Sequence, residues 1–230
     1  MNALRWTRCD DAEQLARRAR ERISAAAAEA IDTRGRFALV LAGGSTPRRC
    51  YELLRDTPQH WSAWHIYFGD ERCLAPDHPQ RNSRLAADAL LDHVPVPAAQ
   101  VHLIAAERGA EAAAQDYRRC VAEALPFDLV LLGVGEDGHT ASLFPGQTAP
   151  AGASVYAVHD APKPPPQRVT LAATTLGRCR QLLFLVSGAG KRGALRQWRA
   201  AVPLPAAGIP CHGVCEALVD AAAWGEAPPP

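Results

Sequence analysis

Two residues in the segment GVGEDGHTASLFPG, from Gly133 to Gly146, have side chains suited to proton transfer. His139 follows a glycine directly, and Asp137 lies two positions before it. Histidine is the usual general base near neutral pH, and a carboxylate beside it can orient or polarise the ring. Because a lone histidine more often has a structural role, the assignment depends on the surrounding loops. The pair predicts a catalytic loop with His139 as the base and Asp137 as its partner.

The same segment matches the pattern G-x-G-x-x-G. In dinucleotide-binding folds this pattern opens a helix and is followed by an acid about 20 residues further on. Asp160 lies at about the right distance. However, Pro145 and Pro150 interrupt the intervening stretch, which has no apolar helical pattern and no strand at the acid. We therefore reject the dinucleotide fingerprint and keep the interpretation of a polar catalytic loop.

A second polar loop, AGGSTP, follows the apolar run FALVLA. Gly43 and Gly44 allow the backbone to turn sharply and to approach a ligand closely. Ser45 or Thr46 can cap the next helix, and Pro47 suits its first turn. A helix start presents unpaired N–H groups and a partial positive charge, which favour phosphate. By itself, this loop is equally compatible with a phosphate cradle and with a turn that binds nothing.

Two more loops place charged residues after apolar runs. In SGAGK, Lys191 can act as a point charge for a phosphate, although the loop lacks the Walker A pattern. In GDER, Asp70 and Arg72 follow a strand, and Arg72 can hold an anion bidentately. Asn82 can add a hydrogen bond or cap the following helix. The competing interpretations of these loops are a surface lysine and a solvated charged turn.

Apolar runs alternate with helical patterns along most of the chain. We expect helices over residues 11–31, 47–55, 82–92, 109–125 and 189–201, and strands over 37–42, 64–68, 127–134, 181–190 and part of 217–224. The proline-rich residues 145–168 are expected to be mostly irregular, with a short strand near 154–158. This alternation predicts an α/β fold with one open, mainly parallel, Rossmann-like sheet and helices on both faces. In such sheets, ligands bind beyond the carboxyl ends of the strands, where all four polar loops fall.

The composition excludes several classes of protein. A formal net charge of +1 indicates neither nucleic-acid binding nor an acidic partner surface, and no stretch resembles a signal peptide or membrane span. The seven scattered cysteines argue for a reducing compartment and against a disulfide framework. Cys211 and Cys215 lack a second pair of ligands, so a metal site is disfavoured. We expect a single domain over residues 1–230, cytoplasmic, monomeric or weakly dimeric, with a frayed tail at 226–230.

Five segments together resemble the 6-phosphogluconolactonase family, in the superfamily that also contains glucosamine-6-phosphate isomerases. They are LAGGSTPRRCYELL, YFGDERCLAPDHPQRNSRLA, FDLVLLGVGEDGHTASLFPG, RVTLAATTL and SGAGKRGAL, and they occur in family order between about residues 37 and 195. The combination GxGxDGHTASLFP is highly specific. The resemblance implies hydrolysis of 6-phospho-D-glucono-1,5-lactone to 6-phospho-D-gluconate in the pentose phosphate pathway. It also implies that catalysis needs no organic cofactor and no metal.

The resemblance further implies roles for individual residues. His139 matches the histidine proposed as general base, which would deprotonate the attacking water. Arg72 matches an arginine at the substrate site, and either Arg72 or loop N–H groups would stabilise the oxyanion. Arg168, Lys191 and the loop 43–46 match positions that surround the sugar phosphate. The other residues expected at the substrate are Asp70, Asn82 and Gly138.

Two other functions remain open. Glucosamine-6-phosphate deaminase shares the loop plan, an acid at the position of Asp70 and the D-G-H sequence, but it has a glutamate where this chain has Phe144. Without that acid, the chain lacks a group suited to ring opening. A non-catalytic sugar-phosphate sensor would normally add a DNA-binding module or lose the histidine. This chain has no spare segment for such a module and retains His139, so both functions are less favoured than lactone hydrolysis.

Overall fold

The computed structural model describes residues 3–225, and its core is a sheet of six strands. Every neighbouring pair in this sheet is parallel. In spatial order the strands are β1 (Arg5–Cys9), β9 (Val214–Asp220), β8 (Cys179–Val186), β5 (Phe127–Gly133), β2 (Phe37–Leu41) and β3 (Trp64–Phe68). All five residues of β2 are buried, as expected of an apolar strand covered on both faces.

A small antiparallel sheet accompanies the main one. Its strands, in spatial order, are β4 (Asp70–Arg72), β7 (Arg168–Leu171) and β6 (Val155–Val158). The α-helices are α1 (Ala12–Arg34), α2 (Ser45–Leu54), α3 (Asn82–Ala89), α4 (Ala110–Ala124), α5 (Ala173–Leu176), α6 (Arg192–Arg199) and α7 (Ala221–Trp224). Short 3-10 helices are η1 (Trp61–Ala63), η2 (Leu91–His93), η3 (Ala98–Gln100), η4 (Ala106–Arg108) and η5 (Ala189–Lys191).

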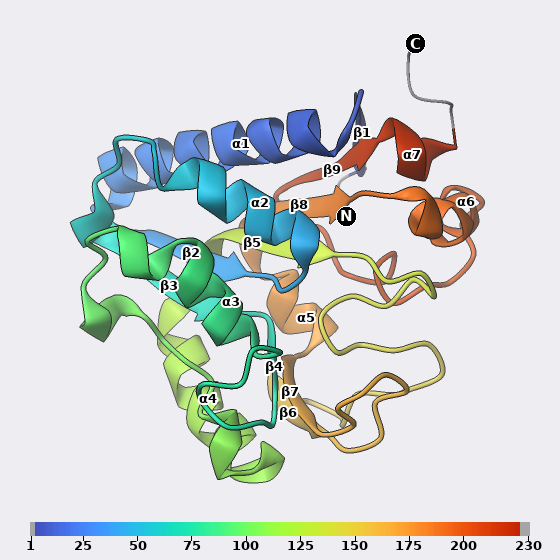
Figure 1. Cartoon of the computed structure of the whole chain (residues 1–230). Coiled ribbons are helices and arrows are strands. Elements are labelled where there is room, and N and C mark those ends of the chain that lie inside the picture. Colours follow the sequence, from blue (N-terminus) through green and yellow to red (C-terminus); the bar gives the residue numbers. More distant parts are fainter. Residues whose placement is uncertain (1–2, 226–230) are drawn as a thin grey trace.

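Helices lie on both faces of the main sheet, as the sequence predicts. Helices α1 and α2 cover one face, while α4, α5 and the small sheet lie on the other side (Figure 1). Helix α1 begins after Asp11, whose side chain accepts a hydrogen bond from the backbone of Gln14, and it ends at Gly35 with φ 72°. Within residues 3–225, no helix combines the length and the apolar character needed to span a bilayer.

The strand order creates a crevice at the carboxyl ends of two central strands. From β2 the chain moves outward to β3, whereas β5, on the other side of β2, leads to β8 and β9 in the opposite direction. The loops after β2 and β5 therefore separate at this point, which is where open α/β sheets bind ligands. These are the loops that contain Gly43–Thr46 and His139.

Several expected elements were wrong in detail. The segment 70–72 was expected as a polar loop, yet it forms β4, because its backbone pairs with β7. Strand β7 itself begins at Arg168, at the end of the stretch expected to be irregular, and β6 confirms the short strand expected there. Strand β1, at the edge of the sheet, was missed, because its residues RWTRC form neither a continuous apolar run nor a regular alternation of polar and apolar side chains. The frayed tail expected at 226–230 lies outside the described residues.

Candidate active site

A pocket of about 250 Å³ lies at the carboxyl ends of the central strands. It brings together the four loops that the sequence singles out. The predicted site residues that line it are Gly43, Gly44, Ser45, Thr46, Asp70, Arg72, Asn82, His139, Arg168 and Lys191. Asp137 and Gly138 belong to the same loop as His139 but do not line the pocket.

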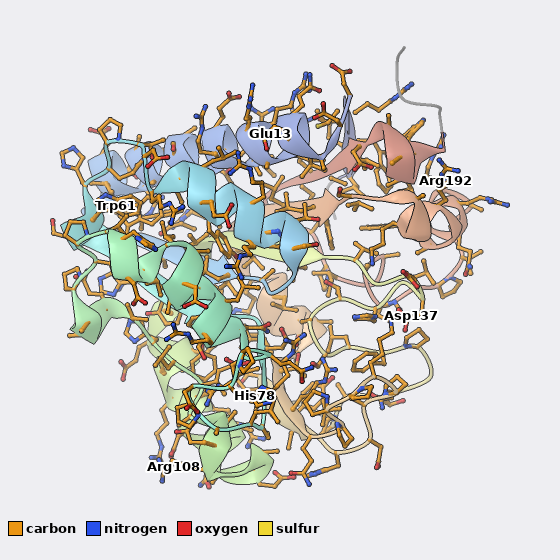
Figure 2. The ribbon with its side chains drawn as sticks, viewed as in Figure 1. Glu13, Trp61, His78, Arg108, Asp137 and Arg192 are labelled. Carbon is orange, nitrogen blue, oxygen red and sulfur yellow. A yellow bond between two sulfur atoms is a disulfide. The ribbon has the colours of Figure 1, made fainter. Side chains whose placement is uncertain are left out.

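His139 and Asp137 form a hydrogen-bonded pair on the loop after β5. The distance between His139 Nδ1 and Asp137 Oδ1 is 2.5 Å, and the histidine side chain is 19% exposed. With Nδ1 donating to the carboxylate, Nε2 is left unprotonated in the neutral ring and free to accept a proton. Figure 2 shows Asp137 at the right of the view, below Arg192.

The surroundings of the pair shift both pKa values downward. Burial lowers the pKa of His139 below its usual value, and the hydrogen bond with Asp137 and the charge of Asp137 only partly oppose this. Burial would raise the pKa of Asp137, but the hydrogen bond from His139 lowers it overall. At neutral pH the histidine is therefore neutral beside an ionised carboxylate, which is the state that a general base requires.

Glycines make this loop conformation possible. The backbone N–H of Gly135 donates to the carbonyl of His139 at 2.7 Å, which folds the loop back on itself. A Cβ atom at Gly135 would overlap the imidazole ring. Gly138 has φ 81°, a conformation that side chains disfavour, and its Cα faces Leu204. The sequence did not lead us to assign Gly135 to the site. Its position four residues before His139 could have indicated a loop that folds back onto the histidine. No helix follows this loop, which agrees with the rejection of the dinucleotide fingerprint.

Phe144 packs beside the catalytic pair. Its ring centroid lies 4.8 Å from that of His139, and the guanidinium carbon of Arg168 lies 5.5 Å from the same ring. Phe144 is 2% exposed, so an aromatic ring fills this position and shields one side of the imidazole. The low-dielectric contact is part of the burial that keeps His139 neutral.

Asp70 is held in a buried network at the base of the pocket. It accepts a hydrogen bond from Ser142 Oγ at 2.7 Å and another from Asn82 Nδ2 at 2.9 Å. The sequence offered Asn82 as a helix cap, but Arg81 occupies the N-cap position of α3, and the Asn82 amide points to Asp70 instead. Within residues 3–225, Asn82 Oδ1 is buried without a partner, beside Gly43. Asp70 and Asn82 thus join the small sheet, α3 and the loop after β2.

The two predicted site arginines are anchored by backbone carbonyls. Arg168 is 4% exposed, and its guanidinium donates to the carbonyls of Lys163, at 2.8 Å, and of Pro164 and Pro165. Arg72 donates to the carbonyl of Gln80, while its Nε is buried without a partner among the described residues. Each arginine therefore orders a surface loop and still borders the pocket.

The start of α2 and the loop that ends in Lys191 face each other across the pocket. Helix α2 begins at Ser45 after Gly44, which has φ 110°, and no side chain caps the helix. The expected caps, Ser45 and Thr46, instead lie within the helix, which leaves the first N–H groups open to the pocket. Lys191 ends η5, and the loop before it is held by Asp220, which accepts hydrogen bonds from Ser187 Oγ and from the backbone of Gly188.

Two charged residues near the site have structural roles. The Glu71 carboxylate is 1% exposed and accepts hydrogen bonds from the backbone N–H groups of Asn82 and Ser83 at the start of α3. Arg81 forms ion pairs with Glu71 and with Glu107. Together these residues fix α3 against β4 and so position Asn82.

Cys211 and Cys215, considered from the sequence only as metal ligands, form a disulfide. This bond links residues four positions apart and is not a framework for the fold. The other five cysteines are free. In the part of the chain that the structure describes, no cluster of three or more histidine, cysteine or acidic side chains could hold a metal ion.

The fold and the pocket define an open α/β protein with a ligand site at the switch point of its sheet. The chain belongs to the family described as glucosamine-6-phosphate isomerases/6-phosphogluconolactonase, whose model matches residues 10–219. It is 39% identical to the 6-phosphogluconolactonase of Mycobacterium tuberculosis over 80% of this chain and 81% of that one. Its structure is similar to that of 6-phosphogluconolactonase from Thermotoga maritima, with a TM-score of 0.88, 28% identity and coverage of 95% and 100% of the two chains.

Other relatives are longer or more distant. The chain is 37% identical to a probable chloroplastic 6-phosphogluconolactonase of rice (Oryza sativa subsp. indica), and the match spans only 58% of that protein's length. A monomeric glucosamine-6-phosphate deaminase has the same fold, with a TM-score of 0.85 and 21% identity. At that identity, the likeness shows the fold alone.

Proposed function

We propose that this protein hydrolyses 6-phospho-D-glucono-1,5-lactone to 6-phospho-D-gluconate, a reaction of the pentose phosphate pathway. One observation carries the proposal: His139, paired with Asp137, borders a pocket at the switch point of the sheet, in a chain of this family. Relatives named as 6-phosphogluconolactonases in bacteria and plants support the choice of substrate.

In the proposed mechanism, His139 activates water. The neutral imidazole accepts a proton at Nε2 as the water oxygen bonds to the lactone carbonyl carbon. Asp137 holds the Nδ1 proton and stabilises the imidazolium that forms. The tetrahedral intermediate then expels the ring oxygen, and the imidazolium returns its proton to this leaving group. The ring C–O bond breaks, a carboxylic acid forms, and the neutral histidine is restored.

Charged and N–H groups of the pocket would bind the rest of the substrate. Arg72 lines the pocket, its Nε has no hydrogen-bond partner among the described residues, and it is the side chain we assign to the developing oxyanion. The uncapped start of α2 at Ser45 and Thr46, with Lys191 opposite, would hold the phosphate. Arg168 would contribute mainly by ordering residues 163–165 beside the pocket. Binding of the remote phosphate would position the carbonyl near His139.

The identity of residue 144 favours lactone hydrolysis over the deaminase reaction. Phe144 is buried against His139 and Arg168, so position 144 offers an aromatic ring beside the histidine and not a carboxylate. Asp70 is tied to Ser142 and Asn82, which suits a positioning role. Lactone hydrolysis needs only an activated water and an oxyanion donor, and it fits this set of residues better than ring opening.

The decisive experiment measures hydrolysis of freshly made 6-phosphogluconolactone against its spontaneous rate. The purified chain should accelerate hydrolysis strongly, and His139→Ala should lower kcat by about 10²- to 10⁴-fold, the range for loss of a general base. The control is His60→Ala, because His60 is exposed at the amino end of β3, whereas the pocket lies at the carboxyl ends of the strands, so turnover should not change. A wild-type rate equal to the spontaneous rate would overturn the proposal. Glucosamine 6-phosphate would then be tested as substrate.

A further inference from the structure

A second groove lies between α6 and α7. Its volume is about 600 Å³, and it shares no lining residue with the pocket described above. Arg192, Arg196 and Arg199 line it together with the apolar side chains of Leu195 and Trp224. Both helices lie at the opposite end of the molecule from α4 (Figure 1). No carboxylate side chain is found among the described residues that line the groove.

The three arginines present a concentrated positive charge. They occupy positions i, i+4 and i+7 of α6, so their side chains project from one face of the helix. None of them forms an ion pair with a carboxylate within residues 3–225. By contrast, Arg49 on α2 pairs with Glu13 of α1 and with Glu52. Since the chain as a whole is almost neutral, this cluster is a local positive feature that suits an anionic ligand.

An aromatic and aliphatic wall completes the groove. The guanidinium carbon of Arg199 lies 4.1 Å from the ring centroid of Trp224, which orients the arginine by a cation–π contact. The Trp224 ring also contacts Trp6 in an edge-to-face arrangement, with centroids 6.2 Å apart. Leu195 is 2% exposed and forms part of the floor. The groove therefore combines a cationic rim with an apolar surface.

Helices α6 and α7 are connected to the main pocket through the loop that ends in Lys191. Arg192 follows directly after Lys191, and its Nε donates to the carbonyl of Ala222 in α7 at 2.7 Å. Asp220 caps α7 through the backbone N–H of Ala223 and also holds Ser187 and Gly188, in the loop that leads to Lys191. A ligand that bridges α6 and α7 would therefore contact the helices to which this loop is attached.

We propose that the groove binds a small phosphorylated organic molecule. Guanidinium groups bind phosphate bidentately, and Arg196 and Arg199 would hold the phosphates while the organic part lies against Leu195 and Trp224. The concave shape and the volume are those of small-molecule sites, whereas a flat basic face would suit an acidic protein better. This site is separate from the proposed lactone pocket and does not depend on its assignment.

The test is calorimetric titration of the full chain with ADP, which combines two phosphates with an aromatic group. Arg196→Gln/Arg199→Gln should weaken ADP binding at least tenfold. The control variant Arg108→Gln/Arg119→Gln loses the same charge on η4 and α4, where Arg108 lies far from Arg192 (Figure 2), and it should bind within about twofold of wild type. Lys191→Gln should also bind within about twofold, because its charge belongs to the other pocket.

Three outcomes would overturn the proposal. The first is equal ADP affinity in wild type and Arg196→Gln/Arg199→Gln. The second is an equal loss in the control variant, which would indicate general charge attraction. The third is a loss confined to Lys191→Gln, which would place ADP in the main pocket. Pyrophosphate, titrated in parallel, should bind more weakly than ADP, and equal affinities would remove the role of Leu195 and Trp224.

Discussion

At the scale of single residues, the state of His139 depends on two opposing influences. Burial, to which the packing of Phe144 contributes, disfavours the charged imidazolium, whereas Asp137 favours it. The charge of Lys163 also lowers the pKa of His139, whereas the charge of Asp70 raises it. Because burial wins, the ring is neutral at neutral pH, and loss of activity is expected only as the pH falls below the ordinary histidine range.

Replacement of Asp137 by asparagine tests this balance. The variant loses the hydrogen bond and the charge that raise the pKa of His139, so the acidic limb of the kcat/KM profile should move to lower pH. At the same time kcat should fall by about 10- to 100-fold or more, because the ring loses its orientation and its imidazolium its counter-ion. The measurement is kcat/KM for lactone hydrolysis from pH 4.5 to 8. An acidic limb that moves to higher pH would contradict the assigned role of Asp137.

The position of Lys191 at the pocket predicts how its replacement changes the kinetics. Its side chain borders the pocket opposite the start of α2. If it binds the phosphate equally in the ground and transition states, Lys191→Ala should raise KM about tenfold or more and leave kcat nearly unchanged. Arg48→Ala is the control, since Arg48 is an exposed residue of α2 paired with Glu52. A normal KM in Lys191→Ala would mean that the phosphate binds elsewhere.

At the scale of elements, the loop after β2 depends on a close approach between Gly43 and α3. A Cβ atom at Gly43 would overlap the buried amide of Asn82, which holds Asp70. Gly43→Ala should therefore displace Asn82, cost about 1–3 kcal/mol in the free energy of unfolding and lower kcat/KM. Gly193→Ala is the matched control, because a Cβ there meets open space. Urea unfolding and steady-state kinetics of both variants measure the effect. Equal stability of Gly43→Ala and wild type would show that the Asn82 contact can relax freely.

The elements also show which features the sequence can predict. Continuous apolar runs predicted β2, β3 and β5, and the Gly-rich loops after them converge as expected, because parallel strands end at one edge of the sheet. Strands β4 and β7 were not predicted as a pair, since each is short and their pairing depends on residues almost 100 positions apart. The anchoring of Arg168 by carbonyls of residues 163–165 was likewise not predictable, because it follows from how the proline-rich segment folds back.

At the scale of the whole molecule, the last strand connects the C-terminal helices with the pocket. Strand β9 lies between β1 and β8, so residues far apart in the sequence share one sheet (Figure 1). It ends at Asp220, which is 2% exposed and joins α7 to the loop before Lys191. Association into dimers stays a prediction, and sedimentation velocity of the full chain at several concentrations would measure it.

Although Asp220 is distant from His139, its replacement should weaken substrate binding. Asp220→Ala leaves Ser187 Oγ and the N–H groups of Gly188 and Ala223 without their acceptor. Because an unmade buried hydrogen bond costs about 1–3 kcal/mol, we expect a clear loss of stability in urea unfolding. The freed loop should also place Lys191 poorly, so KM should rise several-fold while kcat changes little.

A conservative variant separates positioning from a general loss of stability. Asp220→Asn keeps one side-chain oxygen as an acceptor and should recover part of the stability and part of the KM, since the carboxamide can still accept from some of the same groups. If Asp220→Ala lost stability but kept a wild-type KM, Lys191 would be positioned without Asp220. The pocket would then be independent of the C-terminal helices, because the Asp220 contacts would not govern where the loop 187–191 lies.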